Sequence, residues 1–130
     1  MSPPPPTLSF TVHSGRWAVA RLDPAAPIPP WALAGPLASV TRTPHELSVV
    51  CPQSQLPPDQ PAERDWACLQ LIGPFPFSLT GILASFLNPL AQAQVPIFAL
   101  STFDTDWILV PAPRLQLALQ ALRAAGHNEV

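Results

Sequence analysis

The sequence contains no lysine and few charged residues of either sign. Charged side chains make up 11% of its 130 residues, compared with about 25% in an average soluble domain. Six basic and eight acidic residues give a net charge of −2 at pH 7. Nucleic-acid binding needs a basic surface that replaces the counterions of the phosphates, and electrostatic membrane attachment needs clustered cations. We therefore expect neither a nucleic acid nor a membrane as a partner.

Long hydrophobic runs and cysteines are also scarce. The longest apolar stretch is interrupted by Ser85, Asn88 and Pro89, well short of the ~18 residues of a membrane span. The N-terminus has no charged region followed by an apolar one, so we expect no signal peptide and a cytoplasmic location. The only two cysteines, Cys51 and Cys68, lie in apolar segments and are predicted to be buried free thiols.

Signatures of catalysis and of cofactor binding are missing as well. The three histidines, His13, His45 and His127, are scattered and share no spacing typical of a zinc site. The five glycines form no phosphate-binding pattern, and no serine lies in a Gly-x-Ser-x-Gly turn. We therefore expect a protein that is not an enzyme and that uses no metal or other cofactor.

Proline is abundant, with 20 residues, and apolar residues make up 48% of the chain. Residues 3–6 are a proline run that should be extended. The prolines within residues 24–30 and 52–61 lie between apolar segments, where they stiffen connections. The apolar content is sufficient for a compact core.

The first half of the chain is predicted to be rich in short strands. Four β-like segments occupy residues 8–13, 17–22, 37–43 and 46–51. The last two should pair as a hairpin around Pro44 and His45. A helical turn is predicted at residues 30–33, and the polar, proline-rich residues 52–65 are predicted to be a linker.

The second half shows a clearer alternation of strand and helix. Strand-like segments occupy residues 66–71, 95–101 and 106–110. After the first strand, apolar residues at helical spacing form one face: Leu79, Ile82, Leu83, Phe86, Leu87 and Leu90. We expect Ser78 to cap this helix, and Pro89 to kink it or end it near residues 85–88.

A last helix is predicted over residues 113–125, with Gly126 at its end, and residues 128–130 are too few for a full strand. The order β-α-β-β-α is that of a ferredoxin-like fold. Residues 43–52 also match residues 102–111 at a constant offset, each segment beginning with threonine and ending with proline. This internal similarity indicates a duplication.

The predicted fold class is therefore α+β, with two ferredoxin-like (βαββαβ) units in tandem. Residues 8–56 form the first unit, which is degenerate because it lacks long helices. Residues 62–130 form the second unit.

Several segments of the chain resemble a known family. Residues 66–71, 73–83 (GPFPFSLTGIL), 89–91 and 101–110 (STFDTDWILV) resemble bacterial ACT-domain proteins of the tandem, CASTOR-like type, and residues 41–52 resemble the hairpin of that family's first unit. The likeness covers residues 17–127, and STFDTD is its most specific piece. It implies ferredoxin-like ACT units, binding of a small molecule, usually an amino acid, between the units, and a regulatory role without catalysis. Pro76 stands where many relatives have aspartate.

The residues themselves also suit an amino acid, which is a zwitterion. The turn at residues 77–81 opens a helix whose free N–H groups can hold a carboxylate, and Asp104 and Asp106 can hold a cationic group. We favour Asp106, because Asp104 sits at the bend of its hairpin. The predicted site residues are Ser78, Leu79, Thr80, Gly81, Ile82, Ser101, Thr102, Phe103, Asp104, Thr105 and Asp106.

Alternatives remain open for the site and for the protein. Ser78 can be simply a helix cap, Asp104 a turn former and Asp106 a solvated hairpin residue. The rival function is a structural or protein-interaction module that pairs through its sheets and binds no metabolite. With either function we expect a homodimer, because open edge strands favour pairing.

Overall fold

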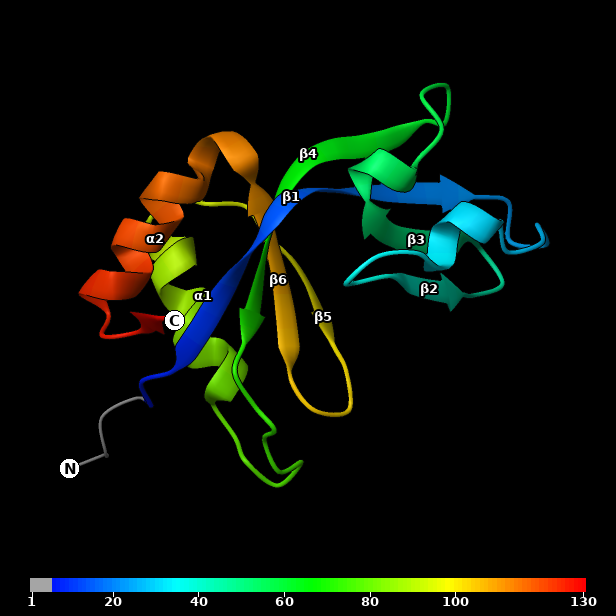
Figure 1. The fold of residues 1–130 in the computed structure, drawn as a ribbon. Coiled ribbons are helices and arrows are strands. Elements are labelled where there is room, and N and C mark those ends of the chain that lie inside the picture. The colour runs from blue at the N-terminus through cyan, green and yellow to red at the C-terminus, as the bar shows by residue number, and fades with distance from the viewer. Residues whose placement is uncertain (1–5) are drawn as a thin grey trace. The chain divides into compact units, whose positions relative to one another are not determined.

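The computed structural model describes residues 6–130 (Figure 1). The chain forms two compact units. The smaller unit is Gly15–Trp66, and the larger unit combines the residues before Gly15 with Ala67–Val130. Strand β1 (Ser9–Leu22) and strand β4 (Ala62–Leu71) each run from one unit into the other. Of the proline run predicted to be extended, residues 3–5 lie outside the described part of the chain.

The smaller unit is built almost entirely from strands. It contains part of β1, a 3-10 turn η1 (Pro30–Leu33), strands β2 (Ser39–Arg42) and β3 (Leu47–Pro52), a second turn η2 (Gln53–Gln55) and the start of β4. Hydrogen bonds join the strands in the order β2-β3-β1-β4. The hairpin predicted around Pro44 and His45 is confirmed, because β2 and β3 pair antiparallel.

Small apolar side chains fill the core of this unit. Ala18, Ala20, Ala32, Val49, Cys51 and Leu56 are buried together. The element order is that of a ferredoxin-like unit in which 3-10 turns stand where helices would be. The proline-rich connections explain the short turns, because proline inside a helix removes a hydrogen bond and clashes with the preceding turn.

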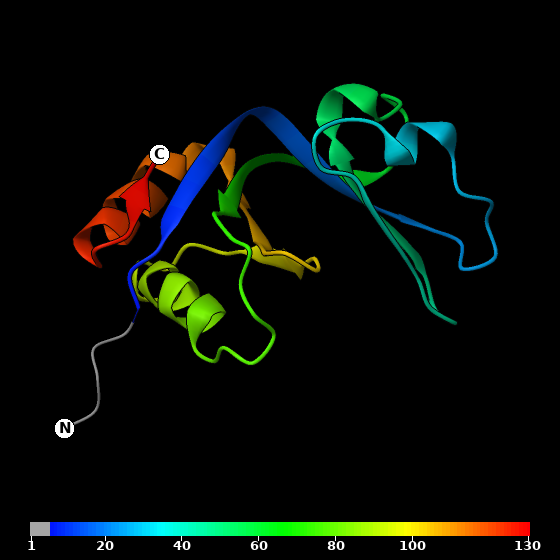
Figure 2. The same ribbon diagram turned by 60° about the horizontal axis from the view of Figure 1, so that its bottom comes forward.

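The larger unit has the α+β ferredoxin-like fold that the sequence predicted. After β4 come helix α1 (Ile82–Gln92), strands β5 (Phe98–Ser101) and β6 (Asp106–Pro111), a 3-10 turn η3 (Ala112–Arg114), helix α2 (Leu115–Ala124) and strand β7 (Asn128–Glu129). The strands are joined in the order β1-β4-β6-β5, and β7 pairs parallel with the start of β1. Helices α1 and α2 lie side by side in both views (Figures 1 and 2).

The core of the larger unit lies between its helices and the sheet. Alternate residues of the strands and the inner faces of both helices supply it: Phe10, Leu69, Leu71, Phe86, Leu90, Ile108, Val110, Leu119 and Leu122. The rings of Phe10 and Phe86 meet edge to face with centroids 5.4 Å apart. None of the helices in residues 6–130 is long and apolar enough to cross a membrane.

Strand β5 begins at Phe98, three residues later than predicted, and two other strands differ more from the sequence prediction. Strand β1 is continuous, whereas residues 8–13 and 17–22 were predicted as separate strands. Gly15 lies inside β1 with a φ of 89°, a left-handed conformation that glycine adopts without steric cost. Strand β4 begins at Ala62, inside the segment predicted to be a linker.

Helix α1 begins later than predicted, and Ser78 does not cap it. The helix starts at Ile82, and Gly81 holds the N-cap position with a φ of 77°. The amide of Ser85 donates to the carbonyl of Gly81 at 3.0 Å, which is the first hydrogen bond of the helix. A left-handed residue just before the helix turns the chain sharply, so Ser78 lies outside its first turn.

The helix does not end near residues 85–88, one of the two outcomes predicted for Pro89, because α1 continues through Pro89 to Gln92. Proline lacks the amide that would donate to the carbonyl of Ser85 four residues earlier. His127 Nε2 donates to that carbonyl at 2.8 Å, and the amide of Leu8 donates to His127 Nδ1 at 3.1 Å. Because a backbone amide can only donate, the ring proton must be on Nε2. The buried His127 therefore satisfies the carbonyl that Pro89 leaves free.

Helix α2 ends as predicted, close to Gly126. Gly126 has a φ of 94°, and its amide donates to the carbonyl of Arg123 at 2.9 Å. The next amide, of His127, donates to the carbonyl of Leu122 at 3.0 Å. These two bonds satisfy carbonyls of the last turn of the helix and reverse the chain. Glycine at this position thus brings His127 back against α1.

Candidate functional site

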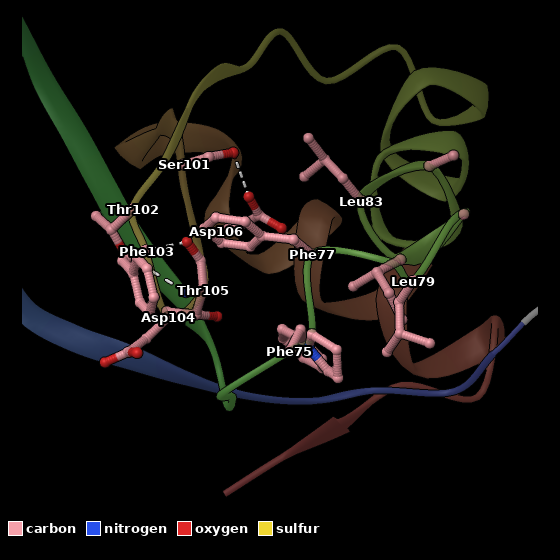
Figure 3. Close-up of a pocket in the computed structure, with 14 residues that line it drawn as sticks. Phe75, Phe77, Leu79, Leu83, Ser101, Thr102, Phe103, Asp104, Thr105 and Asp106 are labelled. Carbon is pink, nitrogen blue, oxygen red and sulfur yellow. Dashed lines mark hydrogen bonds between the residues drawn. The ribbon is translucent and has the colours of Figure 1, made fainter.

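A pocket of about 360 Å³ opens between the start of α1 and the turn that joins β5 to β6 (Figure 3). Its walls are loop 72–81, which leads from β4 to α1, and hairpin 98–111, which contains β5 and β6. The residues that line it are Phe75, Pro76, Phe77, Leu79, Gly81, Ile82, Leu83, Ala84, Ser101, Thr102, Phe103, Asp104, Thr105 and Asp106.

The fold brings together most of the residues predicted for the site. Nine of the eleven line the pocket: Leu79, Gly81, Ile82, Ser101, Thr102, Phe103, Asp104, Thr105 and Asp106. Ser78 and Thr80 are exposed residues of loop 72–81 that do not line it. No ligand contact tests these residues, so their role in binding stays a prediction.

Five further lining residues were missed by the sequence analysis: Phe75, Pro76, Phe77, Leu83 and Ala84. Two phenylalanines in a proline-rich turn belong to no strand or helix face, and this was the signal that could have placed them at a site. Pro76 supplies an apolar wall where the resemblance led us to look for aspartate.

The alternation of β6 explains why Asp106 faces the pocket. Ile108 and Val110 point into the core, and successive side chains of a strand point to opposite faces. Asp106, two residues before Ile108, therefore lies on the same face as the helices. It stands opposite Ser101 in the β5–β6 pair, and the hydroxyl of Ser101 donates to its carboxylate.

Asp104 is oriented differently. It is exposed at the hairpin bend, and its carboxylate points away from the other labelled side chains in Figure 3. The bend itself is closed by Thr102, whose amide donates to the carbonyl of Thr105 at 2.8 Å. Asp106 is thus the carboxylate that the hairpin aims into the pocket.

Three contacts tie the end of β4 and loop 72–81 to the hairpin. The buried hydroxyl of Thr105 donates to the carbonyl of Leu71 at 2.6 Å, and the amide of Phe75 donates to the carbonyl of Asp104 at 3.0 Å. Between them Gly73 approaches so closely that a Cβ there would lie 2.6 Å from the carbonyl oxygen of Asp104. These contacts fix the base of the pocket.

The start of α1 gives the opposite wall a different electrostatic character. The amides of Ile82, Leu83 and Ala84 precede the first intrahelical bond, so the helix itself offers them no acceptor. Such amides and the helix dipole attract negative charge. No arginine, lysine or histidine is among the described residues that line the pocket. The pocket therefore has a carboxylate on one side and free amides on the other.

Two phenylalanine rings stand at the rim. Phe77 and Phe103 have exposed fractions of 78% and 79%, and their ring centroids are 4.9 Å apart at an interplanar angle of 60°. They come from loop 72–81 and from the hairpin turn, so the contact joins the two walls. Over residues 6–130, no three side chains of histidine, cysteine, aspartate or glutamate gather as a metal site.

Comparisons with known proteins bear on both units. Residues 62–124 match the family model of the ACT domain, and residues 15–59 match the model of an N-terminal domain. A crystal structure of protein Atu0741 from Agobacterium tumefaciens is 38% identical to this chain. The alignment covers 96% of this chain and 93% of that one, with a TM-score of 0.90.

Two more distant similarities were found. The bovine (Bos taurus) cytosolic arginine sensor for mTORC1 subunit 1 is 32% identical over 95 residues, which are 65% of this chain. The match spans only 29% of that protein's length. The regulatory subunit of aspartate kinase from Thermus thermophilus shares the fold, with a TM-score of 0.62 at 15% identity, over 93% of this chain and 99% of that one.

Proposed function

Because the chain belongs to the family of the Agobacterium protein Atu0741 and carries an ACT domain over residues 62–124, we propose that it is a non-enzymatic regulatory protein that binds a free amino acid. One observation carries the proposal. The pocket between α1 and hairpin 98–111 presents an inward-facing carboxylate opposite the free amides of a helix start.

This arrangement matches an amino acid in both size and charge. A volume of about 360 Å³ lies at the small end of the range of ligand pockets, about 300–1,000 Å³. Asp106 would accept the ammonium group, and the amides of α1 would donate to the carboxylate. Ser101, which donates to Asp106, holds the carboxylate in place.

The bovine relative is named an arginine sensor, and this makes arginine the first amino acid to test. A cation needs an acceptor, and the described lining of this pocket has one inward-facing carboxylate, that of Asp106, and no cationic side chain.

The organisation of the chain belongs to the same proposal. We propose a tandem of two related units, residues 8–56 and 62–130 by sequence, the first degenerate. The strand–turn–strand–strand–turn–strand order of the smaller unit supports this. The two units share strand β1, because its residues before Gly15 belong to the larger unit and the rest of it to the smaller unit.

We also propose a cytoplasmic homodimer that pairs through the uncharged edge strand β5.

A thermal-shift screen of the chain with the twenty amino acids tests the ligand. A ligand at 100 times its Kd adds about 2.7 kcal/mol to the stability of the native state, so a true ligand raises the melting temperature. If no amino acid shifts the melting temperature, the protein is better described as an interaction module.

Calorimetry with Asp106→Asn then tests the site. The change removes a charge but keeps the size of the side chain and an acceptor for Ser101. We expect binding of the best amino acid to weaken by about 1.5–3 kcal/mol, the range for a hydrogen bond to a charged group, with little loss of stability. Asp59→Asn is the matched control, because Asp59 is exposed in the smaller unit. Equal affinities of Asp106→Asn and the wild type would remove Asp106 from the site.

A further inference from the structure

We infer that the smaller unit contains a site for a guanidinium group, formed by the backbone carbonyls of Pro24 and Ala26, and that the chain's own Arg42 occupies it. This self-occupied site is the counterpart of the pocket in the larger unit, but it accepts only a positive charge. The inference goes beyond the proposed function, because it concerns the other unit and its test needs no amino-acid ligand.

The hairpins of the two units match residue for residue. At the offset that relates residues 43–52 to residues 102–111, strands β2 and β3 have the same bounds as β5 and β6, and the same positions stand opposite each other. The turns also close alike, since the amide of Thr43 donates to the carbonyl of Glu46 at 2.9 Å, in the way described for Thr102. The turn of the β2–β3 hairpin is therefore the counterpart of the turn that lines the pocket.

The groups that would hold an amino acid are replaced in the smaller unit. The counterpart of Asp106 is Leu47, a fully buried side chain without charge. The counterpart of α1 is the turn η1, whose first residue is Pro30 and therefore has no amide to donate. Arg42 stands where the larger unit has Ser101. The hairpin has thus lost both receptors of a zwitterion and gained a cationic side chain.

The loop that precedes η1, residues 23–29, has more acceptors than donors. Three of its seven residues are prolines, which have a carbonyl group but no N–H. The amide of Ala25 donates to the carboxylate of Asp23 at 2.9 Å, and the amide of Ala26 donates to the carbonyl of Asp23 at 3.0 Å. Because the turn uses these amides internally, its remaining carbonyls need a donor from elsewhere.

Arg42 supplies that donor. Its guanidinium group donates through one nitrogen to the carbonyl of Pro24 and through another to the carbonyl of Ala26, the latter at 2.8 Å. A planar, permanently charged group with several N–H donors suits two acceptors at once. The contact ties the loop to the hairpin, a link that the larger unit makes with the Phe75 amide and the carbonyl of Asp104. The smaller unit thus holds a cation at the position where the larger unit has its pocket.

Removal of Arg42 should open the site to free guanidinium. Arg42 is exposed, so Arg42→Ala and Arg42→Gln should both fold and melt within a few degrees of the wild type. Guanidinium chloride is added up to about 50 mM, far below the molar concentrations that unfold proteins. Carbonyl carbon shifts of Pro24 and Ala26, measured by NMR, report binding at the site itself. We expect shifts that saturate in both variants, with a Kd on the order of 10 mM for so small a ligand, and none in the wild type.

Arg21→Ala is the matched control. Arg21 is also an exposed arginine of the smaller unit, and its guanidinium group donates to the carbonyl of His45 at 2.8 Å, in the same hairpin turn. The variant loses the same charge but keeps Arg42 in place, so the carbonyls of Pro24 and Ala26 should not respond. Urea, a planar neutral molecule of the same size, should bind Arg42→Ala several-fold more weakly than guanidinium, because charged donors form stronger hydrogen bonds.

Each result of the titration decides the inference. Shifts that saturate in Arg42→Ala and Arg42→Gln, but not in the wild type or Arg21→Ala, support the self-occupied site. Shifts that never saturate in either Arg42 variant, equal shifts in the wild type, or equal affinity for urea overturn it. Binding of an amino acid in the larger unit, or its failure to bind there, alters none of these results, so the inference and the proposed function fail separately.

Discussion

Gly73 is the residue on which the geometry of the pocket depends most directly. Its conformation is not unusual, but its hydrogen faces the carbonyl oxygen of Asp104 where any larger side chain would collide. The obstacle is backbone, held by the β5–β6 pairing and by the bond from the Phe75 amide. It therefore cannot move aside as a flexible side chain could.

We expect Gly73→Ala to destabilise the native state by about 1–3 kcal/mol, the usual cost of forcing an extra methyl group into a packed position. Urea denaturation measures this loss, and calorimetry should show weaker ligand binding, because loop 72–81 must move away from the hairpin. Ser78→Ala, in the same loop but outside the pocket lining, is the control. An unchanged free energy of unfolding in Gly73→Ala would mean that the two walls are not held together as described.

At the scale of single elements, periodicity predicted the faces of the helices and strands but not their ends. The buried positions of α1, Phe86 and Leu90, were on the predicted face. That α1 could pass through Pro89 was not predictable, because the compensating donor is His127, 42 residues away from Ser85 in the sequence. Local rules describe the cost of proline but not the distant group that offsets it.

The same distinction applies to the site. The residues of the hairpin turn and of the helix start could be predicted, because a zwitterion needs charges that turns and helix starts supply. The proline-rich turn marks Phe75 and Phe77 as residues of no helix or strand face, but their place at this pocket depends on contacts across the fold, such as the bond from the Phe75 amide to Asp104. The continuity of β1 was likewise set by partners far along the chain, β3 and β4.

A double-mutant cycle tests the partnership of Pro89 and His127. We expect His127→Ala to cost about 1–3 kcal/mol, because the carbonyl of Ser85 and the amide of Leu8 lose a buried partner. With Pro89→Ala already present, the new amide can donate to the carbonyl of Ser85. His127→Ala should then cost about 1 kcal/mol less.

Urea denaturation of the wild type, both single variants and the double variant measures the coupling. Asn88→Ala, beside Pro89 on the exposed side of α1, controls for nonspecific effects on the helix. If the losses of stability in the two single variants add up to that of the double variant to within about 0.5 kcal/mol, His127 does not compensate for Pro89.

At the scale of the whole molecule, the composition leaves very few groups that can titrate in alkali. The chain has no lysine and no tyrosine. Arginine keeps its proton throughout this range, and the α-amino group titrates near pH 8. The remaining groups are the two thiols, both buried and unpaired as predicted. Burial raises the pKa of Cys51, and it raises the pKa of Cys68 to about 12.

These raised pKa values predict that stability falls in alkali because of the cysteines alone. Above about pH 9 the thiols of the unfolded chain lose their protons, whereas the native thiols keep theirs, Cys68 until about pH 12. The unfolded state then binds fewer protons, so the contribution of the two thiols to the free energy of unfolding is constant well below pH 9 and decreases above it. Each thiol contributes a slope of at most about 1.4 kcal/mol per pH unit.

Urea denaturation at intervals from pH 8 to pH 11 measures this slope. Cys68→Ala should flatten it, and the double variant with Cys51→Ala should abolish most of what remains, even if both changes lower the stability at pH 8. The slope is the informative quantity, because the loss of the packing contacts of the sulfur is independent of pH, while the loss of its ionisation is not. If the double variant retained the slope of the wild type, burial of the two thiols would not be the cause of alkaline instability.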